Sequence, residues 1–272
     1  MTDKQNIEGC MWQAVSAAIP AGKAILKVYD THFKVSTKAD SSPLTLADME
    51  SHRIISEKLR STGIPVLSEE GKDIPYPERR QWPQFWLVDP LDGTKEFVKR
   101  NGDFTVNIAL IKDAYPLAGV IYVPVSDVLY VGIQYLGSYR FTGAAQLFNK
   151  AADLQGLLKT GTRLPDKETR DIFTVVCSRS HMSTETEAYI DELREEFGEV
   201  DFASRGSSLK LCMVAEGEAD VYPRFAPTME WDTAAGQAIA ECAGAVVVDA
   251  ENNERLQYNK ENLLNPWFIV SR

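Results

Sequence analysis

The sequence predicts a mixed protein in which helices and β-sheets are layered on one another, and three observations support this. Three neighbouring apolar segments between residues 105 and 133 are separated by short turns, which predicts an antiparallel meander. From about residue 150, strand and helix patterns alternate, as in layered α/β folds. The 272 residues are 44% hydrophobic and 25% charged, which is typical of a globular chain long enough to bury a large core without a disulfide or metal staple.

The first half of the chain is expected to begin with two helices. Residues 9–29 place apolar side chains at helical spacing but contain Pro20, so we expect a helix that bends or restarts there. A strand and turn are predicted at 34–38, before a second amphipathic helix at 44–59. The strands predicted after it, with a polar loop over 71–83, lie at 65–68, 85–88, 105–112, 117–124, 128–133 and 139–142.

The second half of the chain shows the alternation of short strands and helices. Its strands are expected at 174–177, 219–222 and 245–248. Its helices are expected at 184–197, 208–216 and 233–242. A polar stretch over 146–171 contains glycine, proline and charge, so we predict two parts, residues 1–150 and 151–272, that meet near this boundary.

Charge and cysteine content exclude several classes of function. The net charge of −10 argues against a nucleic-acid binder, and a small anionic ligand would need cations concentrated at one site. The cysteines are far apart without a C-x-x-C pair, which disfavours both a zinc site and a disulfide framework. With no secretory signal at Met1 and no apolar run long enough to span a bilayer, we expect a cytoplasmic protein without a transmembrane segment.

The most informative segment is WLVDPLDGTKEF, residues 86–97, in which a buried strand is followed by two aspartates three apart. Pro90 restricts the backbone at Asp89, and Gly93 permits a tight turn, so both carboxylates can face one point. Carboxylates without nearby histidine or cysteine suit hard cations such as Mg²⁺ or Mn²⁺. The alternative is an Asx turn in which Asp92 caps a short helix. The preceding apolar strand and the following Gly-Thr favour a functional site.

Three further acidic residues are weaker evidence for a metal site when each is considered alone. Glu69 follows an apolar strand and could simply begin a solvated loop. Asp232 could cap the helix that follows it, and Asp48 could be an acid favoured by a helix dipole. Together with Asp89 and Asp92, these acids are the right set of ligands for two or more Mg²⁺ ions.

The motifs DPLDGT (89–94) and WDTAAG (231–236) resemble those of the inositol monophosphatase family, the Mg²⁺-dependent, lithium-sensitive phosphatases. The resemblance covers nearly the whole chain, from TLAD (45–48) through LSEE (67–70) to WDTAAG. It implies an α-β-α-β-α sandwich of the inositol monophosphatase and fructose-1,6-bisphosphatase type, with the active site where the two halves meet. It also implies two or three bound Mg²⁺ ions, which Mn²⁺ could replace.

Residue roles are carried over from this resemblance by motif. The implied metal ligands are the side chains of Glu69, Asp89, Asp92 and Asp232 and the backbone carbonyl of Leu91. Asp48 and Thr94 are implied to orient and deprotonate the attacking water. A threonine hydroxyl can relay a proton only if a carboxylate accepts from it, which is the role expected of Asp48.

The second half carries the strings SRSH (178–181), GSSLK (206–210) and YPRF (222–225), which are similar to those of the family's bacterial 3′(2′),5′-bisphosphate nucleotidases. This similarity implies hydrolysis of adenosine 3′,5′-bisphosphate to AMP and phosphate, and activity on 3′-phosphoadenylyl sulfate, in sulfur assimilation. The substrate contacts implied are Glu69, Leu91, Asp92, Gly93, Thr94, Ser178, His181, Gly206, Lys210, Arg224 and Asp232. Lys210 and Arg224 are the expected cationic partners of a second phosphate.

Two alternatives to the nucleotidase remain open on the sequence. An inositol or fructose-bisphosphate phosphatase would use the same acids, and only the three second-half strings argue against it. A non-catalytic sensor of metal and nucleotide would need a broken acid set, whereas all five acids and Thr94 are present. The similarity also implies peripheral attachment to the inner membrane, which no cationic amphipathic segment supports, and the sequence carries no signal for an oligomeric state.

Overall fold

The computed structural model describes residues 3–31, 43–166, 172–177 and 183–272. The helices are α1 (Asp3–Tyr29), α2 (Pro43–Leu59), α3 (Tyr76–Arg79), α4 (Thr94–Lys99), α5 (Ala144–Lys150), α6 (Leu154–Leu158), α7 (Thr184–Phe197), α8 (Leu209–Glu216) and α9 (Glu230–Cys242). The strands are β1 (Val66–Ser68), β2 (Gln84–Asp92), β3 (Thr105–Lys112), β4 (Tyr115–Val123), β5 (Val128–Ile133), β6 (Gly137–Thr142), β7 (Thr162–Leu164), β8 (Phe173–Val176), β9 (Val200–Ala203), β10 (Val221–Arg224), β11 (Val246–Asp249) and β12 (Phe268–Ser271).

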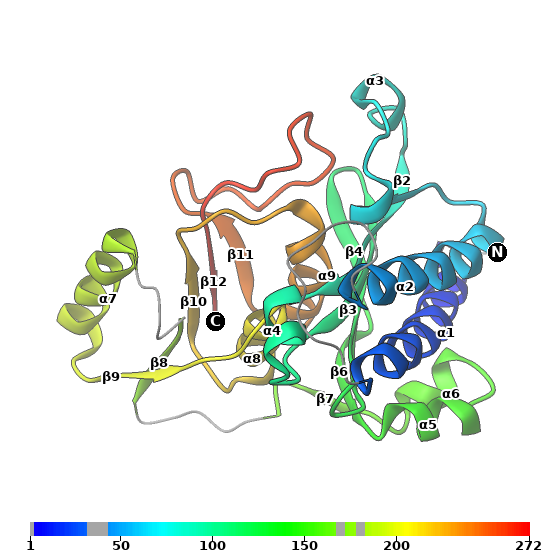
Figure 1. The fold of residues 1–272 in the computed structure, drawn as a ribbon. Helices are drawn as coiled ribbons and strands as arrows, with labels where there is room; N and C mark the ends of the chain where they lie inside the picture. Colours follow the sequence, from blue (N-terminus) through cyan, green and yellow to red (C-terminus); the bar gives the residue numbers. More distant parts are fainter. Residues whose placement is uncertain (1–2, 32–42, 167–171, 178–182) are drawn as a thin grey trace.

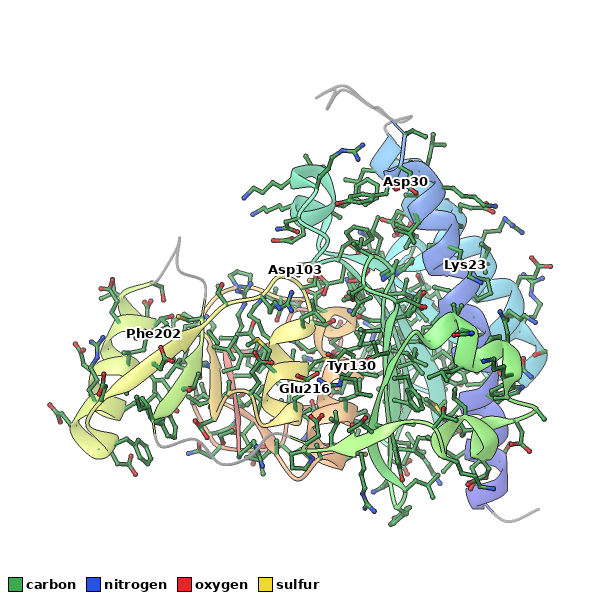
Figure 2. All side chains as sticks on the ribbon, turned by 90° about the horizontal axis from the view of Figure 1, so that it is seen from below. Lys23, Asp30, Asp103, Tyr130, Phe202 and Glu216 are labelled. Atoms are coloured by element: carbon green, nitrogen blue, oxygen red, sulfur yellow. The ribbon has the colours of Figure 1, made fainter. Side chains whose placement is uncertain are left out.

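Helices and sheets alternate in five layers, in the order α-β-α-β-α (Figure 1). Helices α1 and α2 cover the outer face of the first sheet, α8 and α9 lie between the two sheets, and α7 covers the outer face of the second sheet. Figure 2 shows the same layers from below, with side chains filling the spaces between them. The layered architecture expected from the sequence is therefore confirmed.

The first sheet has seven strands in the order β1-β2-β3-β4-β5-β6-β7. Strand β1 is parallel to β2, and every later neighbour pair is antiparallel. Strand β3 is buried on both faces because helices cover both, which explains its almost continuous apolar sequence. Along β2, Trp86 and Val88 pack toward α1 and α2, whereas Phe85 and Leu87 pack toward the layer of α8 and α9.

The second sheet has five strands in the order β11-β12-β10-β8-β9. Strands β8, β9 and β10 run parallel, and β12 is antiparallel to both β10 and β11. Its outer face packs through Val175 against Ile190 of α7. Strand β10 ends at Arg224, which lines the same cavity as Lys210 of α8 and Asp232 of α9.

Helix α9 approaches the first sheet closely because glycines on the sheet leave room for it. A side chain at Gly119 would lie 2.5 Å from the carbonyl oxygen of Ala235, and one at Gly132 would lie 2.6 Å from Cα of Ile239. The small residues of α9 itself, including Ala234 and Ala238, are fully buried between the two sheets. This close contact fixes α9, and with it Asp232, against the strands of the first sheet.

Several predicted elements differ from the structure. Helix α1 continues through Pro20, and the region 71–83, expected as a loop, contains α3. The polar stretch 146–171 contains the end of α5, the short helix α6 and strand β7, which joins the first sheet. The strand expected at 219–222 lies at 221–224, and strands β9 and β12 were not expected.

The physical reason for these differences is that short elements depend on tertiary pairing more than on local pattern. Strand β9 and strand β12 are each only four residues long, and each is paired with neighbours distant in sequence. The strand predicted at 34–38 lies outside the described residues. The division of the chain into 1–150 and 151–272 stays a prediction. Among the described residues, no helix is long and apolar enough to cross a membrane.

Candidate active site

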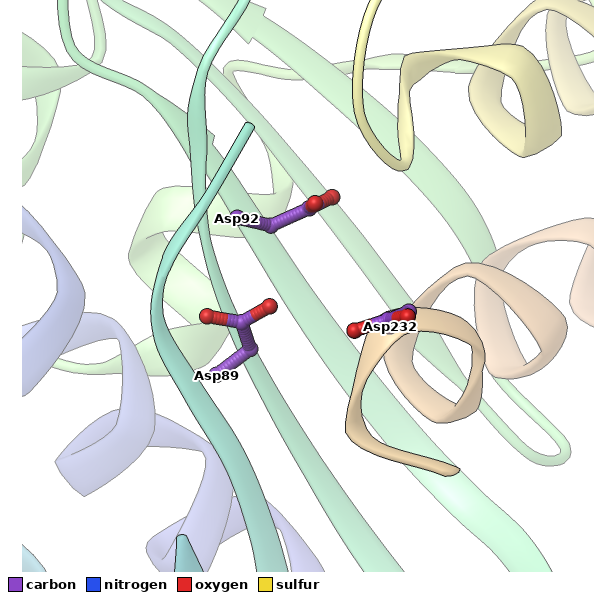
Figure 3. Close-up of side chains that lie close together, drawn as sticks. All are labelled: Asp89, Asp92 and Asp232. Atoms are coloured by element: carbon purple, nitrogen blue, oxygen red, sulfur yellow. The ribbon is translucent and has the colours of Figure 1, made fainter. Parts of the chain in front are cut away.

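Three aspartates from two distant parts of the chain meet between the first sheet and α9 (Figure 3). Asp89 and Asp92 lie near the end of β2, and Asp232 lies in the first turn of α9. One carboxylate oxygen from each lies within 4.8 Å of the others. The structure therefore brings together three of the acids that the sequence placed in a single site.

A β-bulge explains how two acids three residues apart come to face one point. Side chains at positions i and i+3 of a regular strand point to opposite faces. Here the pairing with β3 shifts, so that Asp89 is opposite Asn107 and Asp92 is opposite Thr105. Because three steps along β2 match two steps along β3, Asp89 and Asp92 both face α9.

The turn between the two acids is held by hydrogen bonds. The backbone N–H of Leu91 donates to Oδ1 of Asp89 at 3.0 Å, and Oγ of Ser51 donates to the carbonyl oxygen of Pro90 at 2.7 Å. Gly93 follows with φ of +89°, a conformation in which glycine is favoured. An Asx turn therefore exists at Asp89 and helps to build the site. The alternative in which Asp92 caps a short helix is wrong, because Gly93 is the N-cap of α4 and no side chain caps it.

Asp232 combines a capping role with its place in the cluster. Its Oδ2 accepts a hydrogen bond of 2.8 Å from the backbone N–H of Met229, at the start of α9. The sequence analysis left open that Asp232 caps this helix, and the hydrogen bond from Met229 confirms that it does. The same side chain also faces Asp89 and Asp92, so capping fixes its orientation.

The electrostatics of the cluster disfavour its ionised form when no cation is present. Burial raises the pKa of Asp89 well above its usual range, and repulsion from Asp92, Glu69 and Asp232 adds to the effect. Burial, followed by repulsion from Asp92, raises the pKa of Asp232 to about 7. Burial also raises the pKa of Asp92, although Lys210 opposes this.

Asp48 and Glu69 lie next to this cluster but outside the group of three. Glu69 begins a short 3₁₀ turn directly after β1, and β1 is parallel to β2, so the ends of both strands lie at one edge. Both acids are near enough for their charges to raise the pKa of Asp89. Burial and repulsion from Glu70 raise the pKa of Asp48 to about 8. Glu70, which was not among the predicted site residues, is thus a neighbour of Asp48.

Thr94 is the first residue of α4 and is exposed, one residue beyond Gly93. Helix α4 contacts α2, the helix that carries Asp48. The two residues expected to act on water are therefore on neighbouring helices at the edge of the acid cluster.

The donor set fits a hard divalent cation. Asp89, Asp92 and Asp232 offer only carboxylate oxygens, which Mg²⁺ and Mn²⁺ prefer. One oxygen of Asp48, Oδ1, is buried and has no hydrogen-bond partner among the described residues. Buried carboxylates that repel one another are stabilised by a bound cation, since its charge offsets both the desolvation and the repulsion.

A cavity of about 600 Å³ opens from the acid cluster. Two acids of the cluster and several cations line it together. The charged residues of its lining are Asp92, Asp232, Glu96, Asp103, Lys95, Lys99, Arg205, Lys210 and Arg224. Gly93 and Gly206 also line it. A cavity of this size accommodates a small molecule that carries more than one anionic group.

Two cations of the cavity were predicted from the sequence. Nζ of Lys210 donates to the carbonyl oxygens of Arg205 and Ser207, at 3.1 and 3.0 Å. Arg224 donates to the carbonyl oxygen of Pro227 at 3.3 Å, while its buried Nε finds no partner in the part of the chain that the structure describes. Both charges reach the acids, because Lys210 lowers the pKa of Asp92 and Arg224 lowers that of Asp232. Ser178 and His181 lie outside the described residues.

Sequence reasoning missed the residues that hold Asp92 in place. Oδ2 of Asp92 accepts hydrogen bonds from the backbone N–H of Ser208 and from the side chains of Asn107 and Thr105. One signal was available: Thr105 and Asn107 are polar residues at alternate positions of the otherwise apolar strand TVNIALI. Polar residues on one face of a buried strand need partners, and these partners are part of the site.

Comparison with known proteins places the chain in a class. The model of the inositol monophosphatase family matches residues 9–267, and the chain belongs to this family. The expected resemblance is confirmed, and so is the fold. An inositol monophosphatase from Zymomonas mobilis, with 21% sequence identity, has the same fold with a TM-score of 0.70 over 95% of this chain and 90% of that chain.

Relatives with higher sequence identity have names more specific than that of the family. The chain is 45% identical to the 3′(2′),5′-bisphosphate nucleotidase CysQ of Shigella flexneri over 95% of its length and 98% of the relative. It is 44% identical to the protein of that name in Escherichia coli K12, with the same coverage. The crystal structure of CysQ from Bacteroides thetaiotaomicron, a bacterial member of this family, has 53% sequence identity and a TM-score of 0.91, covering 97% of this chain and 96% of that one.

Replacing Gly206 by alanine is expected to weaken both substrate use and the stability of the fold. A Cβ there would lie 2.8 Å from Cβ and 2.9 Å from the carbonyl oxygen of Asp103, so the cavity wall must shift. Overpacking of this kind costs about 1–3 kcal/mol, and misplacing the wall is expected to lower kcat/KM roughly tenfold or more. Steady-state kinetics and thermal unfolding measure both effects. Gly9→Ala, in α1 with open space around it, is the control and should match the unchanged protein in kcat/KM.

Proposed function

We propose that this chain is a 3′(2′),5′-bisphosphate nucleotidase that removes the 3′-phosphate of adenosine 3′,5′-bisphosphate, giving AMP and phosphate. The observation that carries the proposal is the cluster of Asp89, Asp92 and Asp232 at one end of a cavity that also holds cationic side chains. Identity of 44–45% to proteins named for this activity, over 95% of the chain, supports the same substrate class.

The residues proposed to hold Mg²⁺ are the acids of the cluster. Asp89, Asp92 and Asp232 would provide side-chain oxygens, with Glu69 and the backbone carbonyl of Leu91 completing the set. Bound divalent cations supply three things: neutralisation of the phosphoryl charge, a lowered pKa for water, and stabilisation of the leaving oxygen. We propose that two or three Mg²⁺ ions bind here and that Mn²⁺ can replace them.

Asp48 and Thr94 are proposed to position and deprotonate the attacking water. The hydroxyl of Thr94 would accept a hydrogen bond from water, and it can pass a proton on only to a neighbouring base. Asp48, on the adjacent helix α2, has a pKa of about 8 while the site is without cations, because of its burial and the nearby charge of Glu70. Cation charge nearby would lower this pKa and leave Asp48 ionised as a proton acceptor near neutral pH.

Lys210 and Arg224 are proposed to recognise the 5′-phosphate and ribose side of the substrate. Both line the cavity that Asp92 and Asp232 also line, and both already interact electrostatically with these acids. Ser178, His181, Gly93 and Gly206 are the remaining proposed contacts. Burial of a second phosphate against two cations would favour a bisphosphate over a monophosphate.

Two further parts complete the proposal. Hydrolysis of 3′-phosphoadenylyl sulfate to adenylyl sulfate is proposed, since its 3′-phosphate presents the same reacting group. A cytoplasmic location is also proposed, because Cys10, Cys212 and Cys242 are thiols that form no disulfide among the described residues, as is usual in a reducing compartment.

A substrate comparison tests the nucleotidase proposal. Initial rates with adenosine 3′,5′-bisphosphate, 3′-phosphoadenylyl sulfate and inositol 1-phosphate are measured with Mg²⁺ and with EDTA. The bisphosphate is expected to give a kcat/KM at least about 100-fold above that of inositol 1-phosphate, since two charge-assisted contacts are each worth about 1.5–3 kcal/mol. EDTA is expected to abolish every rate. Faster turnover of inositol 1-phosphate would instead assign the chain to the sugar-phosphate phosphatases of the family.

A further inference from the structure

The two carboxylate oxygens of Asp92 have different surroundings. Oδ2 accepts hydrogen bonds from the backbone N–H of Ser208 at 2.7 Å and from Nδ2 of Asn107 at 3.4 Å. The single hydroxyl hydrogen of Thr105 is shared between Oδ2 of Asp92, at 3.5 Å, and Oδ1 of Asn107, at 2.9 Å. Within the described residues, Oδ1 of Asp92 accepts no hydrogen bond. Since the donors lie around one oxygen, they decide which oxygen of Asp92 remains available to a cation.

The three residues that donate to Asp92 also bond to one another. Oδ1 of Asn107 is 2.9 Å from Oγ1 of Thr105 and 3.0 Å from Oγ of Ser208, and the two hydroxyls are 2.9 Å apart. All three residues are at most 2% exposed. A polar network that is buried and satisfied in this way is rigid, because each member would lose its partners if it moved.

The network joins two different parts of the fold. Thr105 and Asn107 are on β3 of the first sheet, whereas Ser208 directly precedes α8. The adjacent residues Gly206, Ser207 and Lys210 line the cavity. Asp92 therefore contacts the cavity wall through Ser208 and the sheet through Asn107 and Thr105.

We propose that Asn107, Thr105 and Ser208 form a positioning network that locks Asp92 as a one-oxygen ligand and links divalent-cation binding to the wall of the substrate cavity. These are positioning residues, because they act through Asp92 and its metal site rather than on the substrate. The inference rests on the metal site of the proposed function. Partners that orient a metal ligand typically contribute about 10–100-fold to metal affinity.

Mn²⁺ binding in the absence of substrate tests the proposal. The dissociation constant is measured by titration calorimetry for the unchanged protein, Asn107→Ala, Thr105→Val and Thr105→Ser. Asn107→Ala is expected to weaken Mn²⁺ binding by about 10–100-fold. Thr105→Val, which keeps the shape but loses the hydroxyl, is expected to weaken binding to a lesser degree, and Thr105→Ser is expected to restore it.

Tyr130→Phe is the matched control for loss of a buried hydrogen bond. Tyr130, on β5 of the same sheet, donates at 2.6 Å to Oε1 of Glu216 of α8 (Figure 2), and neither residue is part of the acid cluster. This variant is expected to lose thermal stability in EDTA while binding Mn²⁺ normally. If Asn107→Ala does not fold, the comparison of Thr105→Val with Thr105→Ser decides the question.

Two results would overturn the inference in distinguishable ways. Binding of Mn²⁺ by Asn107→Ala and Thr105→Val within twofold of the unchanged protein would show that the network is only structural. Equal weakening in Tyr130→Phe would show the same. Absence of Mn²⁺ binding by the unchanged protein would instead reject the metal site itself, and with it the proposed function.

Discussion

Replacing Asp92 by asparagine is expected to lower kcat/KM for adenosine 3′,5′-bisphosphate by about 10³-fold while the protein remains folded. Asparagine keeps the shape and can still accept the hydrogen bond from the backbone N–H of Ser208. It removes one negative charge from the group formed with Asp89 and Asp232. Cation-based stabilisation of phosphoryl transfer is worth several kcal/mol, and about 1.4 kcal/mol corresponds to a tenfold change in rate.

The measurement is a Mg²⁺ titration of the initial rate for each variant, together with circular dichroism to confirm folding. Asp113→Asn is the matched control. Asp113 is exposed in the turn after β3 and has φ of +49°, which asparagine tolerates, so full activity is expected. An Asp92→Asn enzyme with unchanged kcat/KM and Mg²⁺ requirement would show that the metal site has been placed wrongly.

The second large expected effect is on stability. Without cations, the protein should lose thermal stability as the pH rises from about 6 to about 8.5. Burial and mutual repulsion raise the pKa of Asp232 to about 7 and that of Asp48 to about 8, whereas in the unfolded chain both titrate near pH 4. At low pH both carboxyl groups are protonated in the folded and in the unfolded protein, so they cost no stability. The loss of stability grows as the pH rises through 4, where the unfolded chain ionises, and is complete above about 8, when the groups have ionised in the folded protein as well.

Thermal unfolding in EDTA and in excess Mg²⁺ across this pH range measures the effect. The melting temperature in EDTA is expected to fall by at least about 5 °C, since about 1 kcal/mol shifts it by about 2–4 °C in a chain of this size. Mg²⁺ should remove the fall, because the cation offsets the repulsion. Asp89→Asn, which takes one charge out of the cluster, should show a shallower fall in EDTA. A melting temperature in EDTA that does not decline between pH 6 and 8.5 would contradict this account.

The long elements of the fold could be predicted because their own sequences carry the pattern. The strand at 105–112 and the helix at 184–197 coincide with β3 and α7, since β3 is an almost continuous apolar run and α7 is amphipathic. Strand β12 could not be predicted in the same way. It is four residues long and pairs with β10 and β11, so tertiary contacts determine it.

The acids of the site could be predicted because they lie in short motifs with unusual constraints. Asp89 and Asp92 surround Pro90 at a strand end, and Asp232 begins a helix, so each position limits the direction of a side chain. Asn107 and Thr105 could not be assigned to the site, since only the register of β3 against the bulged β2 places them beside Asp92. Long-range pairing, rather than composition, decides which polar residues of a buried strand are functional.

The glycines beneath α9 link the packing of this helix to the position of Asp232. Gly119 and Gly132 seat the helix directly on the backbone of the first sheet, and Asp232 is presented from that helix. Any loosening that lifts α9 off the first sheet must also pull Asp232, a proposed cation ligand, away from Asp89 and Asp92 on β2. On the proposed function, cation release and separation of the layers would be one event, so retention of Mn²⁺ during heating would report the temperature at which the layers separate.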